Sequence, residues 1–283
     1  MIAGVDVLRY TAFSDQPAGG NPAGVVLDAE SLDDDDLLAI AAEIGYSETA
    51  FISPAESVGE YRVRYFSPLA EVPFCGHATI ASAVALADHG SPEELRFHTR
   101  SGEVVITVGR DGAGHRVATL TSVTPSITAA SDELVAEALA TLGWERKDLD
   151  PDLPPRIGFA GARHLILGVR SRELLAAMSY DFEALCALMT RQDLTTAELV
   201  WRGDATTFYA RDPFPVGGVV EDPATGAAAA AFGAYLRDLQ LIEPPARISI
   251  HQGDDMGRPS LLTVDIDAGT GGIRVSGAAV RLK

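Results

Sequence analysis

The sequence predicts an α+β protein built from two related halves. Two observations lead to this prediction: short β-like runs outnumber helical segments along the 283 residues, and a glycine-centred motif occurs twice. Antiparallel-looking strands with few helices between them favour α+β over a doubly wound parallel sheet. With 47% hydrophobic and 22% charged residues, the chain has the composition of a globular protein that can form a core.

The expected strands are short apolar or alternating runs separated by Gly, Pro and Asp. They cover residues 5–10, 24–27, 50–53, 61–66, 104–108, 117–121, 164–169, 205–210, 247–250, 261–266 and 273–280. The glycine-rich segment 19–24 (GGNPAG) lacks the lysine of a P-loop and the spacing of a dinucleotide-binding loop. We expect this segment to be a turn.

Four helices are expected, and a fifth is possible after Ser171. The first lies between Ser31, a candidate N-cap, and Gly45, which ends it. Its core-facing residues are Leu37, Leu38, Ala41 and Ile44, and its acidic first turn at 33–36 suits the helix dipole. The other helices cover about 78–88, 131–142 and 227–239.

An internal repeat relates the two halves. Segments 71–78 (EVPFCGHA) and 221–228 (EDPATGAA) share Glu, Pro, Gly and Ala at the same offsets, and the match continues without gaps to Asp88 and Asp238. Upstream, 64–68 (RYFSP) loosely resembles 211–215 (RDPFP). Each copy has a proline-fixed extended entry, a glycine turn and a small-residue helix. Two homologous halves explain this pattern better than chance.

The two helix starts, at Gly76 and Gly226, are candidates for anion binding. A helix start leaves unpaired N–H groups at the positive end of the helix dipole. If both starts face one cleft, they can hold a carboxylate and stabilise charge that develops beside it. The alternative is a pair of Ala-rich core helices with glycine turns and no ligand.

Three titratable residues are candidates for catalysis. Glu48 lies in the segment 45–51 (GYSETAF) before an apolar strand, and the alternative is a solvated loop carboxylate. His77 stands where the second copy has Ala227, and Asp222 where the first copy has Val72. The alternatives are a buried histidine satisfied by the backbone and a carboxylate that binds nearby N–H groups. Because the two copies differ at different places, the halves would supply different groups to one site.

The remaining features exclude several classes of protein. Two cysteines, Cys75 and Cys186, are too few for a disulfide scaffold, and we expect Cys75 to be a buried structural residue. The spacing of His, Cys and Asp predicts no metal site. The net charge of −18 disfavours nucleic acids and anionic membranes as partners. With no signal peptide and no apolar run long enough to span a bilayer, we expect a cytoplasmic protein.

Several blocks together resemble the PhzF-like phenazine-biosynthesis family. They are 20–25 (GNPAGV), 47–51 (SETAF), 66–79 (FSPLAEVPFCGHAT), 221–226 (EDPATG) and 252–260, and they occur in family order over nearly the whole chain. The resemblance implies two pseudo-symmetric domains of the diaminopimelate epimerase-like fold, each with β-strands wrapped around a central helix. The expected domains are 1–118 with the C-terminal strand 272–283, and 119–271.

The resemblance also implies an activity. The best-known member of the family isomerises trans-2,3-dihydro-3-hydroxyanthranilate without a cofactor, so we expect an isomerase that moves a proton and a double bond in a small cyclic carboxylic acid. Glu48 matches the general acid/base, and His77 and Asp222 match its polar partners. No cofactor or metal is expected, and a homodimer is a family-level expectation. The residues expected to bind substrate are Ser47, Gly76, Ala78, Gly226 and Ala227.

One departure and two alternatives accompany this resemblance. The family often has Ser where this chain has Ala227, which weakens assignment of the phenazine substrate itself. One alternative is a racemase, epimerase or dehydratase that uses Glu48 and Cys75; related epimerases use paired thiols, but the second thiol position holds Thr225. The other alternative is a non-catalytic protein that binds small acids.

Overall fold

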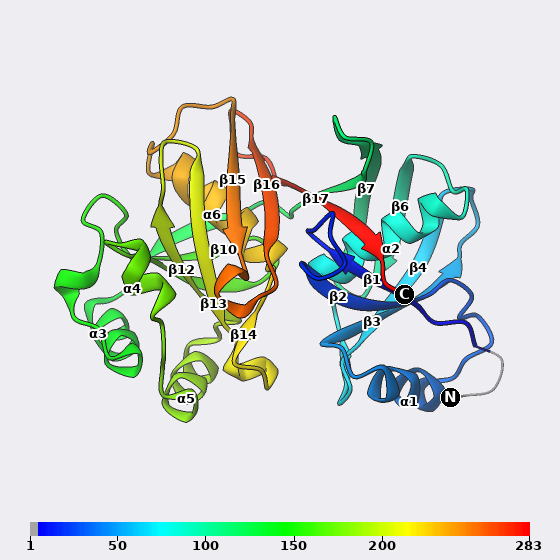
Figure 1. Ribbon diagram of the computed structural model, residues 1–283, viewed down its shortest axis with the longest axis horizontal. Coiled ribbons are helices and arrows are strands. Elements are labelled where there is room, and N and C mark those ends of the chain that lie inside the picture. The colour runs from blue at the N-terminus through cyan, green and yellow to red at the C-terminus, as the bar shows by residue number, and fades with distance from the viewer. Residues whose placement is uncertain (1–4) are drawn as a thin grey trace. The chain divides into compact units, whose positions relative to one another are not determined.

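The structure, a computed structural model, describes residues 5–283 and divides into two compact units. The first comprises Met1–Thr121 with Ser276–Lys283, and the second comprises Ser122–Val275. The last strand, β17 (Arg274–Arg281), pairs antiparallel with β1 (Leu8–Ala12), as the red and blue strands in Figure 1 show. The end of the chain therefore completes the sheet of the first unit.

In the first unit, the strands form a closed ring around one helix. Its strands are β1, β2 (Asn21–Val26), β3 (Glu48–Pro54), β4 (Glu60–Phe66), β5 (Glu71–Val72), β6 (Glu94–Thr99), β7 (Gly102–Arg110) and β8 (Arg116–Thr121). The pairs β2–β3 and β4–β6 are parallel, whereas β1–β2, β3–β4, β6–β7 and β7–β8 are antiparallel, and the pair β8–β17 closes the ring. The central helix α2 (Gly76–Asp88) is buried from His77 to Ala87. Its small apolar residues let the strands approach on every side.

The second unit repeats this order of strands. They are β9 (Ser126–Ala129), β10 (Arg156–Phe159), β11 (Arg163–Gly168), β12 (Thr196–Arg202), β13 (Thr207–Pro213), β14 (Glu221–Asp222), β15 (Ala246–Gln252) and β16 (Ser260–Ile266). Again two pairs are parallel, β11–β12 and β13–β15. The central helix α6 (Gly226–Asp238) has 13 residues, as α2 has. The two units are thus two copies of one α+β fold, as the repeat predicts.

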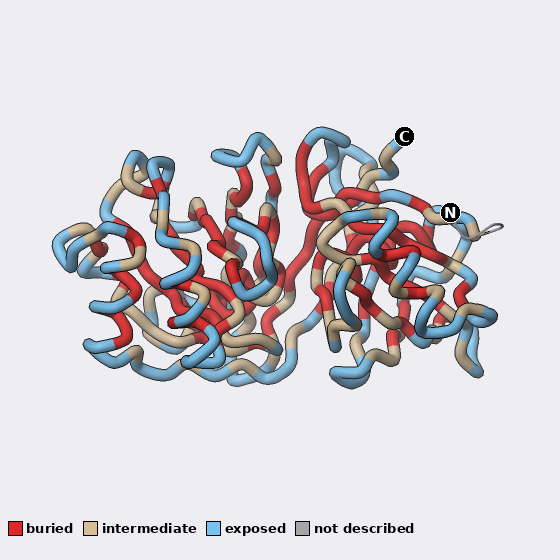
Figure 2. The backbone as a smooth tube through the Cα atoms, turned by 90° about the horizontal axis from the view of Figure 1, so that it is seen from below, coloured by how far each residue is buried: buried red, intermediate tan, exposed pale blue. Residues whose placement is uncertain are grey.

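The second unit has an additional helical layer. Its helices are α3 (Asp132–Leu142), α4 (Arg172–Ala176) and α5 (Phe182–Gln192). Leu165, Leu167 and Leu199 pack with them in one apolar cluster. Side chains alternate along a strand, so the even-numbered residues of β11 and β12 lie on the opposite face of the sheet from these helices. On that face, Phe208 of β13 packs edge to face against Phe232 of α6. Helices cover both faces of β12, and Figure 2 shows buried backbone inside each unit.

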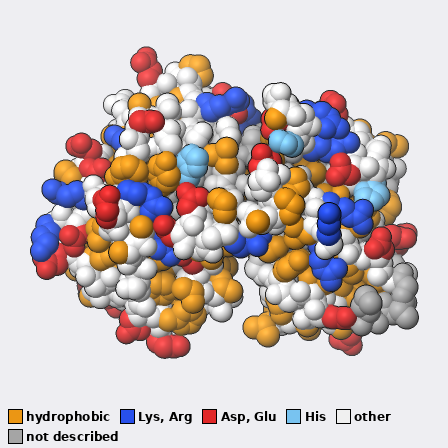
Figure 3. Space-filling view, viewed as in Figure 1, with side chains coloured by type: hydrophobic (Ala, Val, Ile, Leu, Met, Phe, Trp, Pro, Cys, Tyr) orange, Lys and Arg blue, Asp and Glu red, His pale blue; other side chains and the backbone are white. Residues whose placement is uncertain are grey.

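An equivalent ion pair occurs at the same place in each repeat. Arg64 Nε donates to Glu71 Oε1 at 2.8 Å, and Arg211 Nε donates to Glu221 Oε1 at 2.9 Å. Glu71 lies opposite Phe66, as Glu221 lies opposite Pro213. The two pairs differ in exposure, because the Arg64 side chain is 38% exposed and that of Arg211 is 11% exposed. Basic and acidic side chains also lie next to each other on the face in Figure 3.

Two local predictions are corrected by the structure. Asp33, rather than Ser31, caps α1 (Asp34–Ile44), because its carboxylate and that of Asp36 bind each other's backbone N–H groups. Segment 19–24 is not only a turn, since β2 begins at Asn21. Gly24 serves close packing there: a Cβ added to it would lie 2.6 Å from Thr49 Oγ1.

Helices and strands without strong periodicity were missed. The expected helix after Ser171 is the short α4, and a separate helix, α5, begins after its cap Asp181. Strands β5, β6, β9, β10, β12 and β14 were not predicted, and the first strand begins at Leu8 rather than at residue 5. Short 3-10 turns occur at Arg146–Asp148, Pro215–Gly217 and Asp254–Met256. Within residues 5–283, no helix combines the length and apolar character needed to cross a membrane.

Candidate active site

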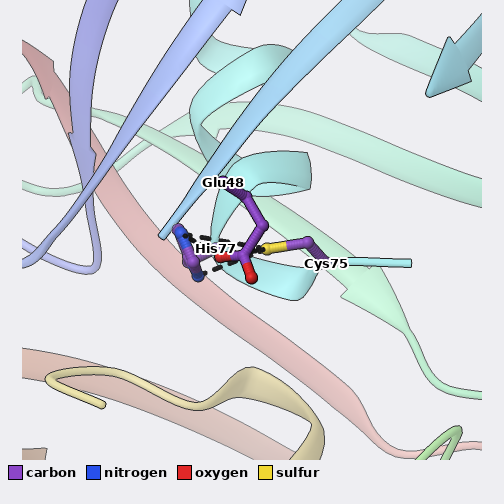
Figure 4. A group of neighbouring side chains, drawn as sticks. All are labelled: Glu48, Cys75 and His77. Carbon is purple, nitrogen blue, oxygen red and sulfur yellow. Dashed lines mark hydrogen bonds and ion pairs between the residues drawn. The ribbon is translucent and has the colours of Figure 1, made fainter. Parts of the chain in front are cut away.

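Glu48 is the first residue of β3, and its carboxylate lies beside the start of α2 (Figure 4). The side chain is 14% exposed. Its Oε2 atom lies 3.4 Å from His77 Nε2 and accepts from Cys75 Sγ at 3.5 Å. The solvated-loop alternative for Glu48 therefore does not hold, since the carboxylate is mostly shielded and contacts two side chains with chemistry of their own.

His77 is the second residue of α2 and is buried. Its Nδ1 atom lies 3.1 Å from Asn21 Nδ2, and its Nε2 atom lies 3.4 Å from Ser47 Oγ. When the Asn21 amide donates to Nδ1, the ring hydrogen is on Nε2 and points toward Ser47 and Glu48. Asn21 thus fixes the tautomer of His77, a role that sequence reasoning missed by expecting a turn at this position.

Cys75 is buried, as predicted, but it is more than a packing residue. Its Sγ atom lies 3.3 Å from His77 Nδ1 and donates to Glu48. It is also the N-cap of α2, where no side chain caps the helix. Its thiol therefore lies at a helix start in contact with both a carboxylate and an imidazole. The position of Cys75 directly before Gly76 is the feature of the sequence that indicates this role, whereas its apolar surroundings favour a structural one.

The predicted substrate-binding residues of the first unit surround this group. Ser47 and Gly76 are half-buried, and Gly76 opens α2. With no side-chain cap, the first N–H groups of this helix are open to a ligand oxygen. Ala78, by contrast, is fully buried. The binding roles of these residues stay predictions.

Asp222 lies in β14 of the second unit and is buried. Its Oδ2 atom accepts a hydrogen bond from Thr225 Oγ1 at 2.6 Å. Gln252 donates to the Asp222 carbonyl at 2.8 Å and accepts from the Thr225 N–H at 3.0 Å. Thr225 precedes the buried Gly226 and the half-buried Ala227 at the start of α6. The ordering role of Gln252 was not predicted.

The first-unit group also has the composition of a metal site. Glu48, Cys75 and His77 each offer one ligand atom, and these atoms lie within 4.8 Å of one another. Zinc accepts this set of ligands. The expectation that no metal takes part therefore stays a prediction for experiment.

Comparison with known proteins gives a consistent result. A family model described as phenazine biosynthesis-like protein matches residues 10–283. The chain is 33% identical over 251 residues to trans-2,3-dihydro-3-hydroxyanthranilate isomerase of Pseudomonas chlororaphis, covering 89% of this chain and 86% of that protein. It is 32% identical over 281 residues to an uncharacterised isomerase of Bacillus subtilis, covering 96% and 94%.

Solved structures agree with these sequence matches. The Bacillus anthracis phenazine biosynthesis protein of the PhzF family is similar with a TM-score of 0.88 at 27% identity, over 99% of this chain and 97% of that one. A hydroxyproline epimerase from Agrobacterium vitis is similar with a TM-score of 0.67 at 12% identity, over 98% and 90%. The second likeness concerns the fold alone.

Proposed function

Because this chain belongs to the phenazine biosynthesis-like (PhzF) family and is an isomerase, we propose that it moves a proton and a double bond within a small cyclic carboxylic acid, without a cofactor. The observation that supports this most is the shielded carboxylate of Glu48 in contact with His77 and Cys75. A shielded carboxylate held in position by its neighbours can act as both general base and general acid.

In the proposed reaction, Glu48 accepts a proton from a substrate carbon next to a conjugated system. The C–H electron pair enters that system, and the same carboxyl group then returns the proton to another carbon. Nothing is oxidised or reduced, so no co-reactant is needed. The N–H groups at the start of α2, near Gly76, would hold the substrate carboxylate and stabilise the delocalised charge.

His77 and Asp222 have supporting roles in this proposal. The Nε2–H of His77, held in that tautomer by Asn21, directs the Glu48 carboxylate. Asp222 is the polar group supplied by the second unit, held by Thr225. Its part in the reaction is supported by its match to the family motif and its burial.

The presence of Cys75 as a second proton carrier raises one second candidate, an epimerase that acts at one carbon of an amino or hydroxy acid. That reaction needs one proton carrier on each face of the carbon, whereas Cys75 and Glu48 contact each other and so lie on one side of any substrate. The repeat supplies no second thiol, because Thr225 occupies the place of Cys75.

A substrate panel tests the proposal against this alternative. Purified protein is incubated with trans-2,3-dihydro-3-hydroxyanthranilate, other cyclic unsaturated acids, and L-proline and trans-4-hydroxy-L-proline. We expect migration of a double bond, followed by ultraviolet absorbance and mass spectrometry, and no epimerisation. Prior treatment with a chelator should leave the rate unchanged. Epimerisation of a saturated acid, or loss of activity on chelation with recovery on adding zinc, would contradict the proposal.

A further inference from the structure

Three buried carboxyl groups lie in a row across three strands of the second unit. Asp212 of β13 lies opposite Asp222 of β14. On the other side of β13, the register that pairs Leu199 with Arg211 places Glu198 opposite Asp212. Residues directly opposite each other in an antiparallel pair share a face, so all three side chains lie on one side of the sheet. Glu198 is 1% exposed and Asp212 is 0% exposed.

Within residues 5–283, neither Glu198 nor Asp212 forms an ion pair, and the polar neighbours of Asp212 are neutral. His164 Nδ1 lies 2.8 Å from Thr196 Oγ1, which donates to Asp212 Oδ1 at 2.7 Å. The threonine hydroxyl has one hydrogen, so His164 must donate through Nδ1–H to Thr196. Burial lowers the pKa of His164 to about 3, so its ring is neutral at physiological pH.

The nearest arginine faces the other way. Arg211 adjoins Asp212 in the chain, so its side chain lies on the opposite face of β13. There it binds Glu221 and the carbonyl oxygen of Ala176 in α4. His251 also lies on that side, stacked on Tyr209. The arginine that β12 places on the Asp212 face is Arg202, four residues along the strand from Glu198, where its guanidinium lies over the ring of Phe208.

Three of the four oxygens of Glu198 and Asp212 have no hydrogen-bond donor among residues 5–283 apart from each other. Both Glu198 oxygens and Asp212 Oδ2 are buried and accept no hydrogen bond from another group within the described residues. Two ionised carboxylates in contact would repel in a medium that screens poorly, whereas one proton between them makes a strong hydrogen bond. Burial raises the pKa of Glu198 to about 8, and burial with the Glu198 charge raises the pKa of Asp212.

The first repeat shows that the fold does not require these acids. Tyr65 lies opposite both Ala50 and Val72, as Asp212 lies opposite Glu198 and Asp222. The hydroxyl of Tyr65 is satisfied by Thr79 at 2.7 Å. The same sheet positions thus accept Ala, Tyr and Val. Buried carboxyl groups usually cost stability relative to apolar residues, so their presence in the second unit indicates a use other than folding.

We propose that Glu198 and Asp212 hold one proton between them and act as a positioning pair for Asp222. This inference rests on the proposed role of Asp222 in the reaction. The pair keeps a single negative charge directly opposite Asp222, and the hydrogen bonds from His164 through Thr196 hold Asp212 in place. That fixed charge helps set the pH at which the enzyme gains or loses its active protonation state.

The shared proton can be tested without any substrate. Melting temperature is measured from pH 5 to 9 for wild type, E198Q and the control D265N. Asp265 lies on β16 of the same unit, and its carboxylate binds Arg247 of β15. The folded state retains a proton that the unfolded state loses near the ordinary pKa of 4.5. Below about pH 6.5, His164 offsets this effect, because it binds a proton in the unfolded state but stays neutral in the folded state. Wild-type stability should therefore fall mainly as pH rises from about 6.5 to 8, and the fall should be smaller in E198Q but unchanged in D265N. Parallel curves for wild type and E198Q would overturn the shared proton.

The positioning role is tested by the pH dependence of kcat/KM with trans-2,3-dihydro-3-hydroxyanthranilate. The double variant E198Q/D212N removes the charge opposite Asp222, so one limb of the profile should move to lower pH by at least half a unit, with D265N unmoved. An unmoved limb in the double variant overturns the positioning role. If wild type does not turn over this acid, or if D222N is as active as wild type, the proposed function or the role of Asp222 in it fails. The stability curves still decide whether Glu198 and Asp212 share a proton. If the double variant does not fold, D212N replaces it, because it moves the remaining charge one strand farther from Asp222.

Discussion

Replacing Glu48 with Gln should lower kcat by about 10³- to 10⁴-fold, the upper part of the range for loss of a general acid–base group. Gln keeps the shape of Glu48 and can still contact His77 Nε2, but it cannot accept a proton from carbon. KM should change little, because the carboxylate of the substrate is proposed to bind the helix start rather than Glu48. Steady-state kinetics on the substrate found in the panel measures both values.

Cys75 provides the matched comparison, since its side chain contacts the same carboxylate. C75S keeps a donor toward Glu48 but removes the thiol as an effective proton carrier. The isomerase proposal predicts a loss of less than about tenfold, below the usual effect of losing a general acid–base group. A loss as large as that of E48Q would instead show that two groups exchange protons with the substrate, and would favour the epimerase alternative.

The second large effect should be on stability, at the buried Arg211–Glu221 pair. E221Q leaves the guanidinium of Arg211 buried without its counter-charge, and we expect a loss of about 3–5 kcal/mol in the free energy of unfolding. The first repeat supplies the control. E71Q removes the equivalent carboxylate from Arg64, which is more exposed and also binds Asp34, so its cost should be about 1 kcal/mol.

Urea unfolding followed by circular dichroism would compare the two variants. Because the chain has two units, the transition must be checked for more than one step before free energies are extracted. Equal losses for E221Q and E71Q would mean that the burial of the pair does not determine its contribution. A stable E221Q protein would mean that the carbonyl groups of α4 alone suffice to hold Arg211.

Most of the fold prediction came from the internal repeat. The motifs around Gly76 and Gly226 identified the two central helices, and the offset between them implied two copies of one fold. Both helices are rich in small residues because strands surround them, which is why neither has an ordinary amphipathic pattern. The strand expected at 24–27 begins earlier, at Asn21, and its start was missed because local turn residues outweighed the packing requirement at Gly24, which only the three-dimensional structure shows.

For the site, sequence reasoning found residues but not their relations. Glu48 and His77 were identified individually, and the structure brings them together with Cys75. The contributions of Asn21 and Gln252 depend on strand pairing, which places residues far apart in the chain side by side. Glu198 and Asp212 gave no signal in the sequence, because an acidic residue in a short strand usually faces solvent.

The most direct test of the central claim, that Glu48 moves the proton between carbons, is the uptake of solvent deuterium. Wild type and E48Q would be incubated in deuterium oxide with the active acid, and the labelled carbon located by nuclear magnetic resonance and mass spectrometry. We predict that wild type labels the carbon that gains the proton as the double bond moves, and that E48Q, shown to be folded by circular dichroism, labels it at least about 10³-fold more slowly. Labelling at the same rate in both proteins would contradict the account, since another group would then carry the proton.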